Sequence, residues 1–409
     1  MSDPGAARAD SAPPALGAPY GWYLAGGSSW FLAWGMQHVM FAWLVVGELQ
    51  LDVARVGTAQ MTQMLPSLVF LIVGGSLADR VERRRALIAL HAATAAVVLG
   101  LSWVVQSGAL SFAVVLLYAV AWGTLQAIQL PIRDALLFDV GKSALPRAVS
   151  GATFSQFLGQ AAGNLVVGSA QWLGTVPVLQ LQAGTLLAGA WPVSRLPRRS
   201  GRARRAPRES ALQEIRSGFS VVARSERLWP LAMLISFNGL FFLGPFFVLL
   251  PILVRDVYAG GVGTLSVAMV MFPLGTAVAS LWIVLRGSVG HRGRAHFLGQ
   301  AGGALCVALL ATTPPFYLVA ALVFVWGLCG GLFLNMGRTL FQEAVPESHR
   351  GRALAVYALA LLGTAPLGQQ GVGLLGEWLS AAAACAIAGG TMLLLLAVSW
   401  VLTPVRSFR

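Results

Sequence analysis

The sequence predicts an all-α membrane protein with twelve transmembrane helices in two pseudo-symmetric six-helix halves. Three observations predict this fold class: the composition, the spacing of the apolar runs, and one basic segment that divides them. Of the 409 residues, 57% are hydrophobic and 11% are charged, whereas soluble domains carry about 25% charged residues. A helix of about 20 mainly apolar residues crosses a bilayer, and the chain contains twelve such runs.

The twelve runs form two sets of six on either side of the basic segment. The first set comprises 25–47, 58–78, 86–106, 109–130, 148–170 and 174–193. The second set comprises 228–253, 262–285, 295–313, 315–336, 353–376 and 380–402. The span that starts at Ala148 is polar, and the division near Pro314 depends on a short connection.

The basic residues indicate how the helices are oriented. The net charge is +13, and with the N-terminus inside, 26 of the 28 Lys and Arg residues fall in inner loops and tails. Only Arg55 and Arg255 fall outside. The positive-inside rule predicts such a division, so the charge reports topology and not nucleic-acid binding. A single lysine among the 28 is typical of a GC-rich bacterial genome. We therefore expect a multi-pass protein of the bacterial inner membrane with both termini cytoplasmic.

The cysteines and the N-terminal residues show no pattern of a disulfide framework, a metal site or a signal peptide. Cys306, Cys329 and Cys385 all fall inside predicted spans, so they indicate neither a disulfide framework nor a metal site. Residues 1–20 are rich in Pro, Ala and Gly and lack the basic start and short apolar core of a signal peptide. They predict a disordered cytoplasmic tail, and no cofactor is expected.

Residues 194–227 are predicted to be a basic cytoplasmic linker between the halves 21–193 and 228–403. Prolines, glycines and like charges between 195 and 208 indicate a loop. After it, Leu212, Ile215, Phe219 and Val222 recur at helical spacing among charges, which predicts an amphipathic helix on the membrane surface. A simple tether is favoured over a regulatory role. Residues 404–409 form a second cytoplasmic tail.

The two halves resemble each other weakly. Arg133 and Arg338 begin similar inner segments and lie 205 positions apart. The basic hairpin 75–85 recurs faintly at 286–294. Two six-helix halves with weak internal similarity are typical of secondary transporters, whose binding site lies between the halves.

The hairpin itself carries a family resemblance. The major facilitator superfamily has the pattern Gly-x-Leu-Ala-Asp-Arg-x-Gly-Arg-Arg-x-x-Leu between helices 2 and 3. This chain matches it in register at Gly75, Leu77, Ala78, Asp79, Arg80, Arg83, Arg84 and Leu87. Glu82 replaces the family glycine. The resemblance covers residues 20–403 and implies the major facilitator fold and transport by alternating access.

Two further stretches are similar to the secretion-effector group, which includes enterobactin and macrolide exporters. They lie at 131–148 and 350–368. This resemblance implies export of a small amphipathic molecule, such as a siderophore, an antibiotic or another drug. The arginine that drug–proton antiporters usually carry in helix 4 is missing ahead of Gly123, and Gly159–Asn164 lacks their usual proline. Proton antiport by the usual drug-exporter route is therefore not favoured.

The resemblance also implies an inner gate. In the family, the loop aspartate caps the inner end of helix 11, so Asp79 is expected to face the helix start at Arg350. A carboxylate at an exposed helix N-terminus is worth about 0.3–1 kcal/mol. The predicted gating residues are Gly75, Asp79, Arg80, Arg83, Arg84, Arg133 and Arg338. The alternative is that the arginines only set the topology.

The predicted spans lack carboxylates near their centres, and His38 is the titratable side chain nearest to one. His38 is therefore the candidate for coupling to protons, although a hydrogen-bonded interior role is the alternative. Neutral polar and aromatic residues recur three and four positions apart, which places them on shared helix faces. Polar faces turn away from lipid. The predicted cavity residues are Trp34, Gln37, His38, Phe41, Gln126, Gln129, Gln156, Gln160, Asn238, Phe241 and Asn335. Hydrogen bonds between helices are the alternative role for them.

The expected partners are the lipid bilayer, a small-molecule substrate and protons as the coupling ion, and the chain is expected to be a monomer. Two other functions stay open: a facilitator or importer of a nutrient or lipid-like solute, and a non-transporting membrane sensor or scaffold. An enzyme is not expected, because no nucleophile–base pair, metal cluster or phosphate loop is recognisable.

Overall fold

The computed structural model describes residues 16–141, 144–197, 219–220, 222–286, 290–344 and 350–408. Within these ranges, the side chains of 71–80, 145–146 and 350–355 are not described. Gly75, Asp79 and Arg80 therefore lie outside the described side chains, and most of the predicted linker lies outside the described residues.

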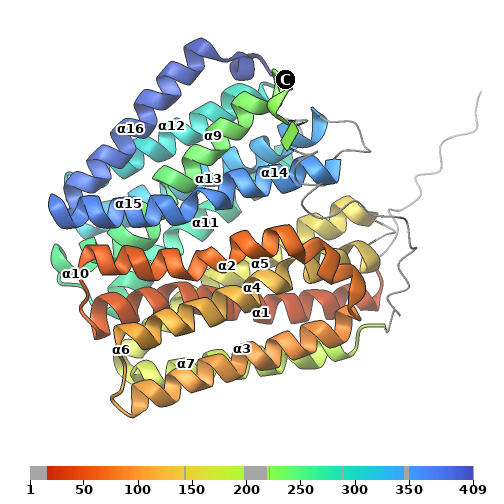
Figure 1. Ribbon diagram of the computed structural model, residues 1–409, viewed down its shortest axis with the longest axis vertical. Coiled ribbons are helices and arrows are strands. Elements are labelled where there is room, and N and C mark those ends of the chain that lie inside the picture. The colour runs from red at the N-terminus through yellow and green to blue at the C-terminus, as the bar shows by residue number, and fades with distance from the viewer. Residues whose placement is uncertain are drawn as a thin grey trace, which may run out of the picture.

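The described residues fold into helices (Figure 1). Those before the linker are α1 (Ala18–Trp43), η1 (Leu44–Glu48), α2 (Val53–Arg80), α3 (Arg83–Gln106), α4 (Phe112–Val140), α5 (Leu145–Gly168), α6 (Ala170–Leu173) and α7 (Thr175–Ser194). Those after it are α9 (Leu228–Phe241), η3 (Pro245–Leu249), α10 (Leu250–Asp256), α11 (Val262–Arg286), α12 (Arg292–Leu310), α13 (Phe316–Glu343), α14 (Arg350–Gly363), α15 (Ala365–Trp378), α16 (Ala381–Leu402) and η5 (Pro404–Ser407).

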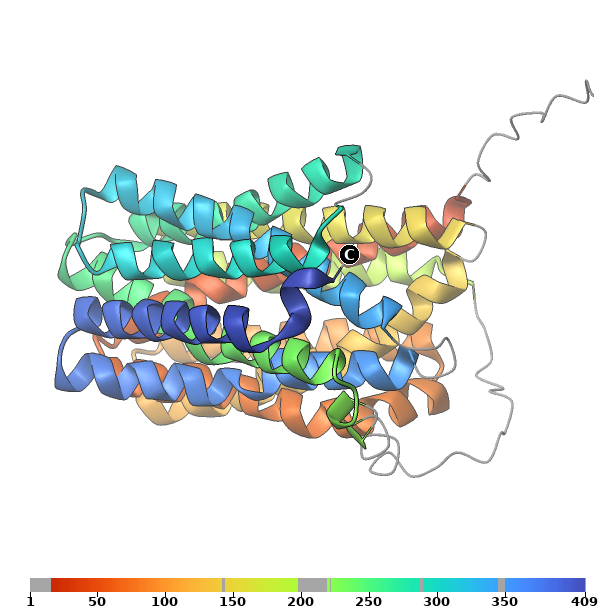
Figure 2. The same cartoon turned by 90° about the horizontal axis from the view of Figure 1, so that it is seen from above.

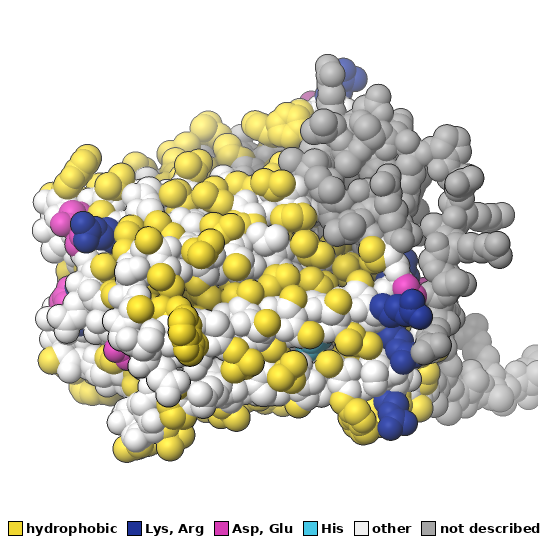
Figure 3. Space-filling model, turned by 60° about the horizontal axis from the view of Figure 1, so that its bottom comes forward, with side chains coloured by type: hydrophobic (Ala, Val, Ile, Leu, Met, Phe, Trp, Pro, Cys, Tyr) yellow, Lys and Arg dark blue, Asp and Glu magenta, His cyan; other side chains and the backbone are white. Residues whose placement is uncertain are grey.

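Each of the twelve predicted apolar ranges is helical. Among the described residues, seven helical segments are long and apolar enough to cross a membrane. They are Ala18–Glu48, Arg83–Gln106, Phe112–Val140, Leu228–Asp256, Val262–Arg286, Phe316–Glu343 and Ala381–Leu402. Large apolar side chains stay exposed along the helices, such as Leu117 and Trp103. Figure 3 shows the same pattern on one face, where apolar side chains cover the middle and charged ones gather at the edges.

Four of the predicted continuous spans depart from a single regular α-helix. Residues 25–47 end in the π-helical segment η1, and residues 228–253 contain the π-helical segment η3, which begins at Pro245. The run that ends at 170 is interrupted at Ser169, between α5 and α6. The run 353–376 breaks at Thr364, whose Oγ1 donates to the Ser236 carbonyl at 2.7 Å. These breaks depend on tertiary contacts and on proline, and apolar run length does not reveal them.

The helices form two groups, each consisting of neighbours in the chain (Figures 1 and 2). In the first group, α1 packs on α5 and α7, α2 on α4, and α3 on α7. In the second group, α11 packs on α13, α12 on α13 and α16, and α9 on α14. The groups meet mainly where α2 runs beside α15 and where α5 runs beside α11. The connections 49–52, 107–111, 257–261 and 311–315 lie at one end of the molecule, called here the distal end.

Glycines bring helices of the first group into direct backbone contact. A Cβ added at Gly35 of α1 would overlap the Gln160 carbonyl of α5. A Cβ added at Gly123 of α4 would overlap the Gln63 carbonyl of α2. Because glycine has no side chain, these helix pairs approach as closely as their backbones allow.

The second group repeats the same contacts. Gly239 lies 204 positions after Gly35 and packs against the Leu361 carbonyl of α14. Gly327 lies 204 positions after Gly123 and packs against the Phe272 carbonyl of α11. The corresponding helix pairs are therefore joined in the same way in both groups.

We expect the substitution Gly35→Ala to destabilise the protein, because the added methyl group would push α1 away from the backbone of α5. Overpacking of this kind costs about 1–3 kcal/mol. The matched control is Gly100→Ala in α3, where the added atom meets open space and improved helix propensity contributes up to about 1 kcal/mol. Thermal unfolding in detergent would be measured for both. Equal midpoints for the two variants would contradict the prediction.

Candidate functional site

His38 of α1 lies where the two groups of helices meet. Its Nδ1 lies 3.2 Å from Nε2 of Gln160 in α5. An amide nitrogen only donates, so Nδ1 accepts and the neutral ring carries its proton on Nε2. The ring centroid lies 4.6 Å from that of Trp34 and 5.0 Å from that of Phe247 in η3. The structure thus brings three predicted cavity residues together with one aromatic residue of the second group.

The side of this layer formed by the second group is aromatic. The Phe246 ring meets Phe247 edge to face at 4.9 Å and lies tilted against Phe272 of α11 at 5.0 Å, measured between ring centroids. Trp326 of α13 lies 5.8 Å from Phe246 and 5.6 Å from Phe272. None of the side chains named in this layer carries a formal charge. A surface of aromatic rings and one amide suits a neutral or amphipathic molecule.

Several polar atoms in the layer are buried without a hydrogen-bond partner in the described structure. They include Nε1 of Trp34 and Nε1 of Trp326. A buried polar atom left unpaired costs about 1–3 kcal/mol. A ligand or an ordered water molecule that pairs with these atoms would recover that free energy.

Gln37 and Phe41 have different surroundings from Trp34 and His38. Gln37 is 1% exposed, and its Oε1 accepts hydrogen bonds from the Tyr118 hydroxyl of α4 and, at 3.3 Å, from Nε2 of Gln182 in α7. Phe41 is buried and stacks on Tyr118. Residues three and four apart cover a broad helix face, so one such row contacts two different neighbours. Gln37 and Phe41 therefore belong to the core of the first group.

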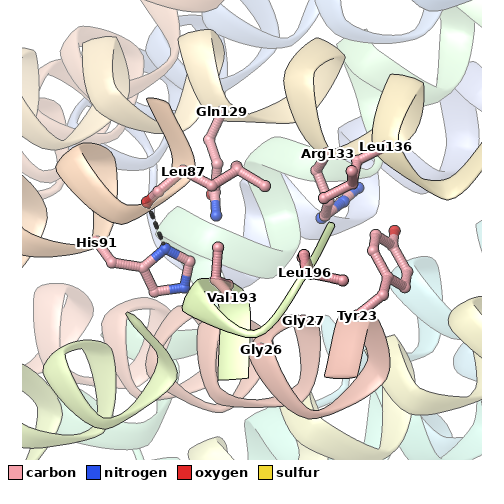
Figure 4. A pocket seen from close by; sticks show the side chains of 10 residues that line it. All are labelled: Tyr23, Gly26, Gly27, Leu87, His91, Gln129, Arg133, Leu136, Val193 and Leu196. Carbon is pink, nitrogen blue, oxygen red and sulfur yellow. Dashed lines mark hydrogen bonds between the residues drawn. The ribbon is translucent and has the colours of Figure 1, made fainter. Parts of the chain in front are cut away.

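Gln126 and Gln129 of α4 also have different surroundings. Oε1 of Gln126 accepts a hydrogen bond of 3.2 Å from Nε1 of Trp122 on the same helix. Gln129 is buried and lines a narrow pocket within the first group. Figure 4 shows this pocket, which is lined by Tyr23, Gly26, Gly27, Leu87, His91, Gln129, Arg133, Leu136, Val193 and Leu196.

The other predicted cavity residues lie in the helices as follows. Gln156 is half-buried on α5. Asn238 is buried, and its Nδ2 donates to carbonyls of its own helix, at 3.1 Å to Leu234. Phe241 is half-buried on α9. Asn335 of α13 donates from Nδ2 to Ser280 Oγ of α11 at 3.1 Å, so it joins two helices of one group.

The predicted inner network is partly described. Nη1 of Arg83 lies 2.5 Å from Oδ2 of Asp139, which ties α3 to the end of α4. Nη1 of Arg84 donates to the Leu196 carbonyl at 3.1 Å. Both contacts stay within the first group. With the Asp79 side chain outside the described set, its expected contact with the start of α14 stays a prediction.

The remaining two arginines of that network differ in exposure. Arg133 pairs with Asp134 at 3.1 Å and lies 4.5 Å above the ring of Phe31. Arg338 of α13 is exposed. The 205-residue repeat therefore places them at corresponding points of the chain with unequal surroundings.

Two buried histidines were missed by the sequence analysis. His91 of α3 and His296 of α12 are buried, and Nε2 of each has no described hydrogen-bond partner. Nδ1 of His91 lies 2.8 Å from the Leu87 carbonyl, and Nδ1 of His296 lies 3.1 Å from the Phe333 carbonyl. The two histidines are 205 positions apart, the spacing of the two arginines, so the internal repeat could have identified them.

Comparison with protein families and relatives gives concordant matches. Residues 23–361 match the sequence model of the Major Facilitator Superfamily. The Staphyloferrin A transporter of Staphylococcus aureus (strain NCTC 8325 / PS 47) is 24% identical over 327 residues, which cover 76% of this chain and 78% of that protein.

Solved structures share the fold at low sequence identity. The nucleoside transporter NupG is 14% identical with a TM-score of 0.75, and the match covers 94% of this chain and 98% of that one. A bacterial homologue of the human lysosomal transporter Spinster, in an inward-facing and unoccupied conformation, is 14% identical with a TM-score of 0.66, and the match covers 97% of each chain.

Gln37 lies in the core of the first group, whereas Gln160 lies beside His38 between the groups. Substitutions of these two glutamines should therefore change the stability by different amounts. We expect Gln37→Leu to lower the free energy of unfolding by about 1–3 kcal/mol, because it leaves the buried Tyr118 hydroxyl unpaired. Gln160→Leu removes a half-buried contact to His38 and should cost less than half as much. Unfolding in detergent measures both, and a larger loss for Gln160→Leu would contradict the assignment of Gln37 to the core.

Proposed function

The chain belongs to the Major Facilitator Superfamily, and from this premise we propose that it is a secondary active transporter working by alternating access. The twelve helical spans form two halves of six, with both termini on the cytoplasmic side of the bacterial inner membrane. Two pairs of glycines at corresponding positions support a duplicated architecture: Gly35 with Gly239, and Gly123 with Gly327. The two glycines of each pair make equivalent contacts between helices, one in each half. The distribution of arginines supports the orientation.

The observation that carries the proposal is the contact of His38, Trp34 and Gln160 with Phe247. It lies between the two groups of helices, which is where secondary transporters bind their substrates. Unpaired polar atoms beside aromatic rings support a site that a substrate completes. In this proposal, substrate contacts His38 and Gln160 from one half and Phe247 from the other.

The distal end is closed in this state. Nδ2 of Asn164 donates across the groups to the Met269 carbonyl at 3.0 Å. The Val53 amide at the start of α2 donates to Oε2 of Glu377 at 3.1 Å. With the distal end outside the cell, substrate in this state would enter and leave from the cytoplasmic side. The Asp79 contact to α14 would then form when the inner end closes.

We propose export of a small amphipathic molecule, such as a siderophore, an antibiotic or another drug. The uncharged central layer supports an amphipathic cargo over a strongly ionic one, because a buried charge needs a partner. The name of the Staphylococcus aureus relative supports a siderophore as one cargo to test. A facilitator or importer is the second candidate, and it is favoured by the missing helix-4 arginine ahead of Gly123.

Counterflow into proteoliposomes tests transport directly. Purified protein would be reconstituted with unlabelled erythromycin or staphyloferrin A inside, and uptake of the labelled compound would be followed. We expect transient accumulation above equilibrium that depends on the protein, and a strong reduction in the variant Asp79→Asn. Arg85→Gln is the control, because Arg85 is exposed and is not one of the residues that match the family pattern.

Two outcomes of this assay would count against the proposal. Equal fluxes with and without protein for a broad panel of amphipathic compounds would contradict transport. Unchanged flux in Asp79→Asn would contradict the inner gate and favour the alternative in which the arginines of the hairpin only set the topology.

His38 is proposed as the proton-coupling residue, and His38→Gln tests this role. Glutamine keeps a hydrogen-bonding group near Gln160 but cannot take up a proton. We expect exchange of labelled cargo to continue within about twofold, while acceleration of flux by an imposed pH gradient is lost. Acceleration that persists in His38→Gln would exclude His38 as the coupling group.

A further inference from the structure

We propose that Gln60 and Arg255 hold the distal gate closed by binding backbone carbonyls at the two π-helical segments, where the regular helical hydrogen bonding is disturbed. Each residue belongs to one group of helices and binds the π-helical segment of the other. This inference rests on the proposed alternating access, in which the distal end must open once in every cycle.

The first contact joins α2 to η3. In a regular α-helix, the carbonyl of Phe247 would accept from the N–H of residue 251. Residue 251 is proline, which has no N–H. The regular i+4 donor is therefore absent, and Nε2 of Gln60 donates to the Phe247 carbonyl at 3.1 Å. Gln60 is 3% exposed, so this hydrogen bond lies in a protected environment where an unpaired carbonyl is costly.

The second contact joins α10 to η1, which ends α1. The Leu49 amide donates to the Leu44 carbonyl at 3.0 Å, five residues back, and the chain leaves the helix at Gln50, whose φ is 47°. The Val46 carbonyl is therefore one of the unpaired carbonyls of a helix C-terminus. Nη1 of Arg255 donates to it at 3.2 Å and to the Leu51 carbonyl at 2.8 Å.

The charge of Arg255 adds to this contact. A cation at a helix C-terminus interacts favourably with the partial negative charge of the last carbonyls. Nε of Arg255 also pairs with Oδ1 of Asp256 at 2.5 Å, which fixes the direction of the guanidinium. Arg255 is one of only two basic residues at the distal end, so topology alone gives no reason for an arginine at this position.

The two contacts are reciprocal and lie at different depths. Arg255 closes the rim, where α1 ends, and Gln60 closes a level nearer to His38, because Phe247 touches both Gln60 and His38. A π-helical segment is a common feature of functional sites. Here it exposes a carbonyl to the opposite group, so separation of the groups breaks the bond without breaking either helix.

The experiment measures the opening of the distal end directly. Spin labels would be attached at Ser107→Cys and Thr312→Cys, two exposed distal positions in opposite groups, after the three native cysteines have been replaced by alanine. Pulsed electron–electron double resonance in liposomes gives the distribution of distances between the two spin labels. The test variants are Gln60→Leu, Arg255→Gln and the double substitution.

Gln182→Leu is the matched control. Gln182 is also a buried glutamine whose Nε2 donates to a backbone carbonyl, that of Ala33 at 3.0 Å, but both residues belong to the first group. It reproduces the loss of a buried amide-to-carbonyl bond without touching the contact between the groups. If Gln60→Leu does not fold, Arg255→Gln at the rim carries the test.

We expect each test substitution to raise the ratio of distally open to distally closed molecules about three- to tenfold, as the loss of one such hydrogen bond implies. The double variant should shift it further, and Gln182→Leu should leave it unchanged. An unchanged distribution in Gln60→Leu and Arg255→Gln, or an equal shift in Gln182→Leu, would overturn the proposal.

The distance measurement separates this proposal from the proposed function. An unchanged distribution in folded variants, combined with counterflow by the wild type, would reject the gate and leave transport intact. A shifted distribution in a protein that transports none of the compounds tested would support the gate and count against the proposed cargo.

Discussion

A backbone carbonyl or amide inside a bilayer has no water to pair with, and this constraint governs the structure. At some points where a helix is interrupted, a side chain pairs with a backbone carbonyl of a neighbouring helix. The Thr364 hydroxyl donates to the Ser236 carbonyl where α14 breaks from α15. The same requirement draws Gln60 to the Phe247 carbonyl opposite Pro251. Many of the buried amides therefore serve the backbone, and only some are available to a ligand.

Close packing of helices through glycine is a second feature that the bilayer favours. Helices in lipid gain little free energy from burying apolar side chains against each other. Gly35 and Gly239 place backbones in contact at corresponding points of the two groups. The duplication does not extend to the central layer. The position 204 residues after His38 is the buried aromatic residue Phe242. The architecture is thus repeated, while the polar chemistry at the centre comes from the first group.

Because of this asymmetry, one layer can both bind a substrate and control the opening of the distal end. Phe247 contacts His38 through its ring and Gln60 through its carbonyl, so the centre of the molecule and the distal closure share one residue. A substrate that displaces the Phe247 ring would also act on the segment whose carbonyl Gln60 holds. Binding energy would in this way bias the distal end, which alternating access requires of a coupled transporter.

The class, the family and the approximate helix positions could be predicted from the chain alone, because apolar runs of spanning length and an in-register loop motif are local signals. The sequence also singled out His38, Trp34 and Gln160. It could not separate these residues from Gln37, because spacings of three and four place residues on a broad face that contacts two neighbouring helices. It also missed Phe247, an ordinary aromatic residue in an apolar run.

Which polar groups meet across the two groups of helices depends on the folded arrangement and could not be predicted from the chain. The contacts of Gln60 and Arg255 have no local signal in the chain, since Gln60 binds a carbonyl 187 positions away and Arg255 binds two carbonyls 209 and 204 positions away. Which carbonyls need a partner depends on where a π-helical segment and a proline disturb the helix, and which side chain reaches them depends on packing. Local sequence carries neither piece of information, because both arise from contacts between distant segments.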